Sequence, residues 1–269
     1  MKFILSLTIL ILICSKIHSQ DSVDNFKKYT YDIEGYNYDG GSFPIYAQGS
    51  GFFIRYNSKI LFVTAKHVLG GYDDSCRRVK NAPYIMNIAL HNEKGAINFQ
   101  SIQINTEKFQ DTVNCFGFRE SPDLAFFTIE NPENKTIYSI EHFLPFDIPK
   151  NFDSLQIIGF PTVEERDSVT GKHLLKPASL LLITRYSLFQ NSRYHAMDGI
   201  KTDSINYVVE TKDIVINRKL KGYSGSPVFI KDKTLNRYFF SGIFIAAEEV
   251  HPYIFIINPK TIEENLKNL

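Results

Sequence analysis

The chain is built mainly from short apolar runs that are separated by turn-forming residues. From Gly41 onward, runs rich in Ile, Phe, Val and Tyr alternate with Gly, Asn, Asp and Pro. Such runs predict many short strands, and the lack of long amphipathic helices argues against an alternating α/β sheet. The pattern therefore predicts an all-β protein, built as a sandwich or as barrels. We expect strands near residues 43–47, 51–56, 60–64, 85–90, 97–104, 124–129, 155–160, 179–188, 207–210, 227–230, 239–247 and 253–257.

A polar stretch that contains proline, near residues 145–153, divides these strands into two similar groups. A protein with two β lobes and a site between them is the natural interpretation. We expect residues 41–148 to form an N-terminal β-barrel and residues 149–269 to form a C-terminal β-barrel with a terminal helix.

The last residues of the chain predict a short helix. Asn258 is a favourable N-cap residue, and Pro259 suits the first helical turn. Apolar residues then follow at helical spacing along one side, at Ile262, Leu266 and Leu269. This is the clearest helix signal in the chain.

The first 20 residues resemble a secretory signal. Lys2 precedes an apolar run, and a short polar segment follows it. That run is too short for a membrane span, and no later stretch approaches about 20 apolar residues. We expect residues 1–20 to be removed on export to the periplasm or the cell exterior, with no stable membrane association afterwards. Residues 21–40 would then be a leading arm or a propeptide.

Composition gives little support to several classes of function. The chain has 30 basic and 29 acidic residues, and the leader contributes only Lys2 and Lys16, so there is no electrostatic case for binding nucleic acid. CxxC, HExxH and clustered His/Cys spacings are missing, and we expect neither a metal nor a cofactor. Cys76 and Cys115 could form a disulfide in an exported chain or remain as two buried thiols.

Three polar residues lie at the edges of expected strands, where a rigid scaffold can orient them. His67 follows the strand near 60–64, Asp123 precedes the strand near 124–129, and Ser224 lies in the turn KGYSGSPVF. Taken singly, each is an ordinary surface or turn residue. Together they are what acyl transfer needs, because a serine hydroxyl requires an imidazole base that a carboxylate holds in one tautomer.

The segments T-A-K-H, D-L-A and G-Y-S-G-S-P-V resemble the motif blocks of the chymotrypsin/trypsin-like serine peptidases, in the family's His…Asp…Ser order. The resemblance extends from about residue 43 to residue 269. It implies two six-stranded antiparallel β-barrels of the chymotrypsin-like type. It also implies a secreted, monomeric serine endopeptidase that cuts peptide or protein substrates.

The resemblance also implies a role for each residue. Ser224 would be the nucleophile, His67 the general base and then acid, and Asp123 the residue that orients His67. The backbone N–H groups of Gly222 and Ser224 would form the oxyanion hole.

Some residues depart from the digestive members of the family. Tyr223 stands where those enzymes have an Asp that receives a new N-terminal amine, which argues against that mode of activation. S-G-S-P resembles the glutamyl endopeptidases, yet Phe244 replaces the His that they carry in the following strand. Arg218 falls where the family lines its primary pocket, and a basic pocket would favour acidic substrates. The expected substrate-binding residues are Arg218, Phe244, Ile245 and Ala246.

Two alternatives have a different mechanism. An α/β-hydrolase would need G-x-S-x-G, but Ser226 occupies the last position of that motif and only His251 follows Ser224. A catalytically weak or inactive binding protein on a peptidase fold is the second alternative, because a sequence does not reveal whether the three side chains are aligned.

Overall fold

The structure is a computed structural model. The described residues are 23–36, 45–69, 85–91, 97–105, 123–129, 137–161, 178–184, 206–212, 220–247 and 252–269. The predicted signal segment, Cys76, Cys115 and Arg218 lie outside these ranges. Within them, no helix is both long and apolar enough to cross a membrane.

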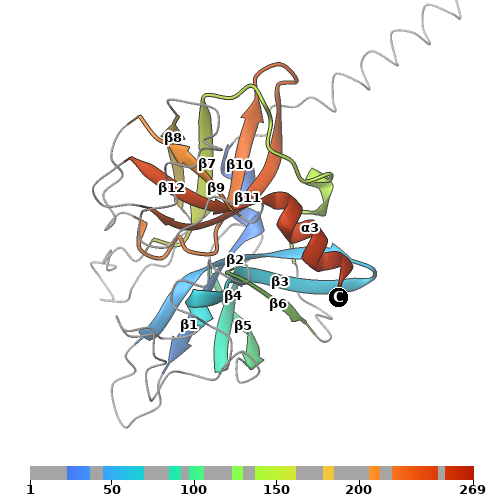
Figure 1. Cartoon of the computed structure of the whole chain (residues 1–269). Coiled ribbons are helices and arrows are strands. Elements are labelled where there is room, and N and C mark those ends of the chain that lie inside the picture. The colour runs from blue at the N-terminus through green and yellow to red at the C-terminus, as the bar shows by residue number, and fades with distance from the viewer. Residues whose placement is uncertain are drawn as a thin grey trace, which may run out of the picture.

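The first half of the chain forms a six-stranded sheet in which the order is β5-β4-β1-β2-β3-β6 (Figure 1). All its neighbouring strands are antiparallel. Its strands are β1 (Thr30–Tyr36), β2 (Ile45–Tyr56), β3 (Lys59–Ala65), β4 (Ile85–His91), β5 (Ile97–Asn105) and β6 (Leu124–Thr128). The long strand β2 pairs with both β1 and β3, and the 3-10 helix η2 (Lys66–Leu69) follows β3 directly.

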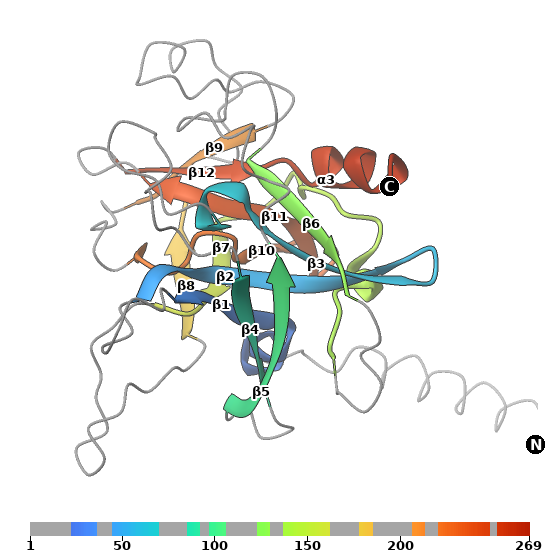
Figure 2. The same ribbon diagram turned by 90° about the horizontal axis from the view of Figure 1, so that it is seen from below.

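The second half forms another six-stranded antiparallel sheet, with the order β8-β7-β10-β11-β12-β9 (Figure 2). An isolated antiparallel bridge between Thr184 and Thr211 joins the chain just beyond its two edge strands. Its strands are β7 (Ser154–Gly159), β8 (Ala178–Ile183), β9 (Asn206–Glu210), β10 (Pro227–Asp232), β11 (Arg237–Ala247) and β12 (Tyr253–Ile257). The two sheets confirm the expected all-β class with two six-stranded halves.

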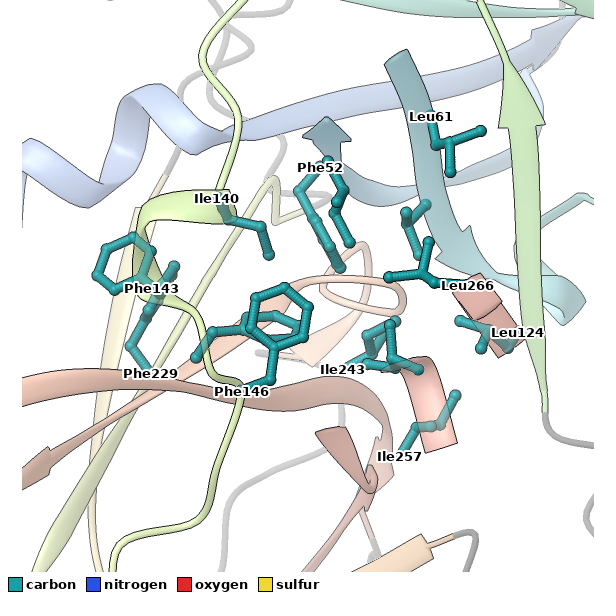
Figure 3. Close-up of a cluster of buried hydrophobic side chains, with 14 of the residues drawn as sticks. Phe52, Leu61, Leu124, Ile140, Phe143, Phe146, Phe229, Ile243, Ile257 and Leu266 are labelled. Carbon is teal, nitrogen blue, oxygen red and sulfur yellow. The ribbon is translucent and has the colours of Figure 1, made fainter. Parts of the chain in front are cut away.

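Alternation along the strands produces three hydrophobic cores. In β2, Phe53 belongs to the core of the first half, whereas its neighbours Phe52 and Ile54 belong to a core shared by both halves. The shared core also contains Phe229 and Ile243 of the second sheet (Figure 3). A third core fills the second half. Since successive side chains of a strand point to opposite faces, one strand can serve two cores.

The C-terminal helix α3 (Pro259–Lys267) confirms the predicted helix. The Asn258 side chain accepts a hydrogen bond from the backbone N–H of Lys260, as an N-cap should. Ile262 and Leu266 are buried in the shared core, where Leu266 lies near Leu61 and Leu124 of the first sheet (Figure 3). The helix therefore packs the second half against the first.

The first sheet begins earlier than predicted. We expected a leading arm or propeptide over residues 21–40, but Val23–Tyr29 forms the 3-10 helix η1 and Thr30–Tyr36 is strand β1 inside the sheet. The boundary at residue 41 was therefore wrong. The segment TYDIEGY does alternate polar and apolar residues, but Asp and Glu are rare in strands and conceal the pattern. The strands expected near 43–47 and 51–56 are one strand, β2.

Strand β1 buries two carboxyl groups. Asp32 is fully buried and Glu34 is 6% exposed, on the face opposite Tyr31 and Ile33 of the first core. Burial, followed by the nearby charge of Glu34, raises the pKa of Asp32 well above its ordinary value. A carboxyl group whose folded-state pKa is raised stabilises the fold at low pH, and this stability is lost as the pH rises through the folded-state pKa.

Replacing Asp32 by Asn should therefore flatten the pH dependence of stability, because Asn keeps the shape of the protonated acid and cannot ionise. As the pH is raised from 5 to 8, the free energy of unfolding should fall in the wild type but not in the variant. Over this range the variant should therefore gain about 1–2 kcal/mol relative to the wild type. Urea unfolding at both pH values measures this. Parallel pH profiles for the two proteins would contradict the assignment.

Candidate active site

His67 and Asp123 are held together by the pairing of β3 with β6. His67 lies in η2, one residue after β3 ends, and Asp123 immediately precedes β6. The Asp123 carboxylate accepts two hydrogen bonds from His67, from ring Nδ1 at 2.5 Å and from the backbone N–H at 2.8 Å. The carboxylate therefore fixes both the ring and the backbone of His67. The second ring nitrogen, Nε2, is not bonded to this carboxylate.

The two side chains shift each other's pKa. Burial raises the pKa of Asp123, but the His67 charge and the hydrogen bonds from His67 and Lys66 outweigh it, so the net pKa is lowered. Burial lowers the pKa of His67, but the charge and hydrogen bond of Asp123 outweigh it, and the net pKa is raised. Asp123 is therefore an anion at neutral pH, and its charge favours the protonated form of the His67 ring.

Ser224 lies on a tight turn between Leu220 and strand β10. Gly222 and Gly225, on either side, have φ angles of 91° and 86°, a region that favours glycine. A Cβ atom on Gly225 would also collide with the backbone oxygen of Ser50 and lie 3.0 Å from the backbone N of Ala65. Glycine is therefore needed both for the turn and for its close approach to β2 and β3.

The same glycine contacts bring the Ser224 turn to the strand end that carries His67. Ala65 is two residues before His67, and the Ser50 N–H donates to the Ser224 carbonyl at 2.8 Å. A Cβ atom on Gly49 would lie 2.5 Å from the Val68 side chain and 3.0 Å from the Ser224 carbonyl oxygen. The turn and η2 therefore meet over the Gly49–Ser50 segment of β2.

The backbone N–H groups of the turn fall into two sets. Those of Tyr223, Gly225 and Ser226 donate to backbone carbonyls at 2.9–3.0 Å. Those of Gly222 and Ser224 have no acceptor within the described part of the chain. Two unpaired N–H groups beside a serine are what an oxyanion hole requires.

The Ser224 hydroxyl donates to the backbone carbonyl of Ile245 at 3.2 Å. Among the described residues, the His67 ring is hydrogen-bonded to Asp123 and not to Ser224. The Ser224 side chain is partly exposed. Its hydroxyl can be redirected by rotation about one staggered bond, and catalytic hydrogen bonds are often long or misaligned before substrate binds.

Tyr223 anchors the turn from the other side. Its side chain is 4% exposed and packs in the core of the second half, where burial raises its pKa to about 12. A Cβ atom on Gly159 would lie 2.7 Å from the Tyr223 ring. The phenol therefore stays neutral at physiological pH and holds the turn by packing instead of by an ion pair.

The other expected site residues have different outcomes. The side chains of Phe244 and Ile245 are 1% and 2% exposed and belong to two cores, so contact with a substrate would have to come from their backbone. Their place at a substrate site stays a prediction. The backbone of Phe244 lies beside the Ser224 turn, since the Gly225 N–H donates to the Phe244 carbonyl. Ala246 is partly buried, and Arg218 lies outside the described residues. Among those residues, no group of three or more His, Cys, Asp and Glu could hold a metal ion.

Sequence reasoning missed Ser50, which contacts the turn and both halves of the protein. Its hydroxyl donates to the Gly222 carbonyl at 2.8 Å and accepts from the Phe160 N–H at 2.9 Å. The signal was the pair of flanking glycines, Gly49 and Gly51, which indicates close packing around a strand.

Among solved structures, the active form of the Rv3671c protease from M. tuberculosis has a similar fold. The TM-score is 0.50 and the identity 13%, over 93% of this chain and 85% of that chain. No protein family and no curated protein matches the sequence. A likeness at this identity shows the fold alone, which is the chymotrypsin-like double β-barrel, a peptidase fold.

Proposed function

We propose that this chain is a serine endopeptidase that hydrolyses peptide bonds through Ser224, His67 and Asp123. The observation that carries the proposal is the double hydrogen bond from His67 to the Asp123 carboxylate. Beside it lies a serine turn with two N–H groups that have no acceptor among the described residues. A serine nucleophile, an imidazole base and a carboxylate that orients the imidazole are the groups that acyl transfer requires.

In the proposed reaction, the Ser224 hydroxyl rotates from the Ile245 carbonyl to His67 Nε2 and attacks the carbonyl carbon of the substrate. His67 takes the hydroxyl proton, while Asp123 accepts the Nδ1–H bond and stabilises the imidazolium. The N–H groups of Gly222 and Ser224 stabilise the oxyanion. His67 then protonates the leaving amine, and water hydrolyses the acyl-enzyme by the same steps in reverse.

Cleavage of a fluorescently labelled, unfolded protein tests this proposal. The wild-type chain should hydrolyse it, and Ser224→Ala should reduce the rate by about 10⁴-fold or more, because the nucleophile is removed. Ser241→Ala is the control, since the Ser241 hydroxyl, like that of Ser224, donates to backbone carbonyls. Equal rates for wild type and Ser224→Ala would contradict the proposal.

A binding protein on a peptidase fold is the second candidate. It is favoured by one observation, that the Ser224 hydroxyl is bonded to the Ile245 carbonyl. A folded wild-type protein that retains unfolded peptides on a column and releases them uncut would support this candidate.

For location, we propose export from the cell, on the ground of the apolar N-terminal run. Retention of residues 1–20 in the mature protein would contradict export.

A further inference from the structure

Ser50 is a fully buried residue of β2 that makes four hydrogen bonds to three other segments. Its N–H donates to the Ser224 carbonyl and its hydroxyl to the Gly222 carbonyl, both at 2.8 Å. The Phe160 N–H, just after β7, donates to the hydroxyl at 2.9 Å. The Thr64 hydroxyl of β3 donates to the Ser50 carbonyl at 2.7 Å. One side chain and its own backbone thus connect both sheets to the Ser224 turn.

These bonds hold particular peptide units of the turn. The Gly222 carbonyl belongs to the Gly222–Tyr223 unit, and the Ser224 carbonyl belongs to the Ser224–Gly225 unit. Between them lies the Tyr223–Ser224 unit, which carries the unpaired N–H of Ser224. Because peptide units are planar, fixing the units on both sides restricts the direction of that N–H. The Gly222–Tyr223 unit also adjoins the unit that carries the unpaired N–H of Gly222.

The Ser50 hydroxyl is closely packed against the end of β7. A Cβ atom on Gly159 would lie 2.9 Å from the Ser50 hydroxyl and would collide with the Ser226 hydroxyl. Removing the hydroxyl would take away the hydrogen bond that holds the Gly222 carbonyl, and the turn would be freer to move.

We propose that Ser50 is a positioning residue for catalysis, whose hydroxyl sets the direction of the two N–H groups that stabilise the oxyanion. The inference rests on the proposed peptidase function. It assigns Ser50 an effect on the transition state, where the oxyanion exists, and little effect on substrate binding.

The test compares Ser50→Ala with Ser241→Ala in the full chain, with a peptide substrate and at a temperature where both are folded. Ser50→Ala should lower kcat by about 10–100-fold and leave KM within about threefold, because a small misplacement of catalytic groups is costly. Ser241→Ala should keep both constants, since its hydroxyl bonds to Asp147 and Phe239 carbonyls away from the turn. Unchanged kcat in Ser50→Ala, or an effect confined to KM, would overturn the inference.

Hydrogen exchange separates this failure from failure of the proposed function. In Ser50→Ala, the amides of residues 220–226 should exchange faster than in the wild type and in Ser241→Ala, whether or not peptides are cut. A wild type that cuts nothing would refute the peptidase function and with it the catalytic role. Equal exchange in all three proteins would refute Ser50 as the residue that orders the turn.

Discussion

Asp123→Asn should lower kcat by about 10⁴-fold while the fold stays intact. The amide oxygen of Asn can still accept the backbone N–H of His67, now bonded at 2.8 Å, so η2 keeps its position. The amide nitrogen, however, is a donor, and it would face ring Nδ1 where a carboxylate now accepts at 2.5 Å. His67 would then carry its proton on Nε2, the nitrogen that must accept the serine proton.

The pH dependence of hydrolysis gives the same prediction a second readout. Catalysis needs a neutral His67, and Asp123 raises the pKa of that ring, so kcat/KM of the wild type should rise with pH through the raised pKa. In Asp123→Asn the raising charge is lost, and the midpoint of the rise should move to lower pH. Steady-state kinetics from pH 5 to pH 9 measure both effects. An unchanged kcat and midpoint would show that Asp123 does not act on His67.

Phe26→Ala should lower the free energy of unfolding by about 3–5 kcal/mol. The Phe26 ring is 1% exposed and stacks on Phe229 of β10, with ring centroids 4.8 Å apart and an interplanar angle of 11°. The Phe26 ring also makes an edge contact with Tyr238, at a centroid distance of 4.8 Å, and a tilted contact with Phe143, at 5.5 Å. The loss would leave a large cavity where η1, ahead of the first sheet, packs against the second half.

The exposed residue Leu181 supplies the matched control. It is 57% exposed on β8, so Leu181→Ala should change the free energy of unfolding by less than about 0.5 kcal/mol. Chemical denaturation monitored by tyrosine fluorescence compares the two variants. A change below about 1 kcal/mol for Phe26→Ala would mean that η1 does not pack against the second half, and would restore the leading-arm interpretation.

Much of this architecture could be predicted because local chemistry determines it. Short apolar runs with turn residues between them are sufficient to predict the strands, and Asn258 with Pro259 is sufficient to predict where α3 begins. His67, Asp123 and Ser224 were found because acyl transfer demands these three residue types, each at a strand edge. Their roles in catalysis remain a prediction.

The remainder depends on contacts that sequence patterns do not encode. Strand β1 was missed because Asp32 and Glu34 occupy buried strand positions, where carboxyl groups are rarely found. The burial of Phe244 and Ile245 in two different cores could not be predicted, because it depends on which elements pack on the two faces of β11. Ser50 was missed because its importance comes from Gly222 and Phe160, which are more than 100 residues away in the chain.

A covalent label on Ser224 tests the central claim most directly. The folded wild-type chain is treated with a fluorophosphonate, and the modified residue is located by mass spectrometry of its peptides. We predict one added group, on Ser224, and no such group in His67→Ala, because the hydroxyl then lacks its base. A folded wild type that remains unmodified at Ser224, or a His67→Ala variant that is modified as fast as the wild type, would contradict the proposed mechanism.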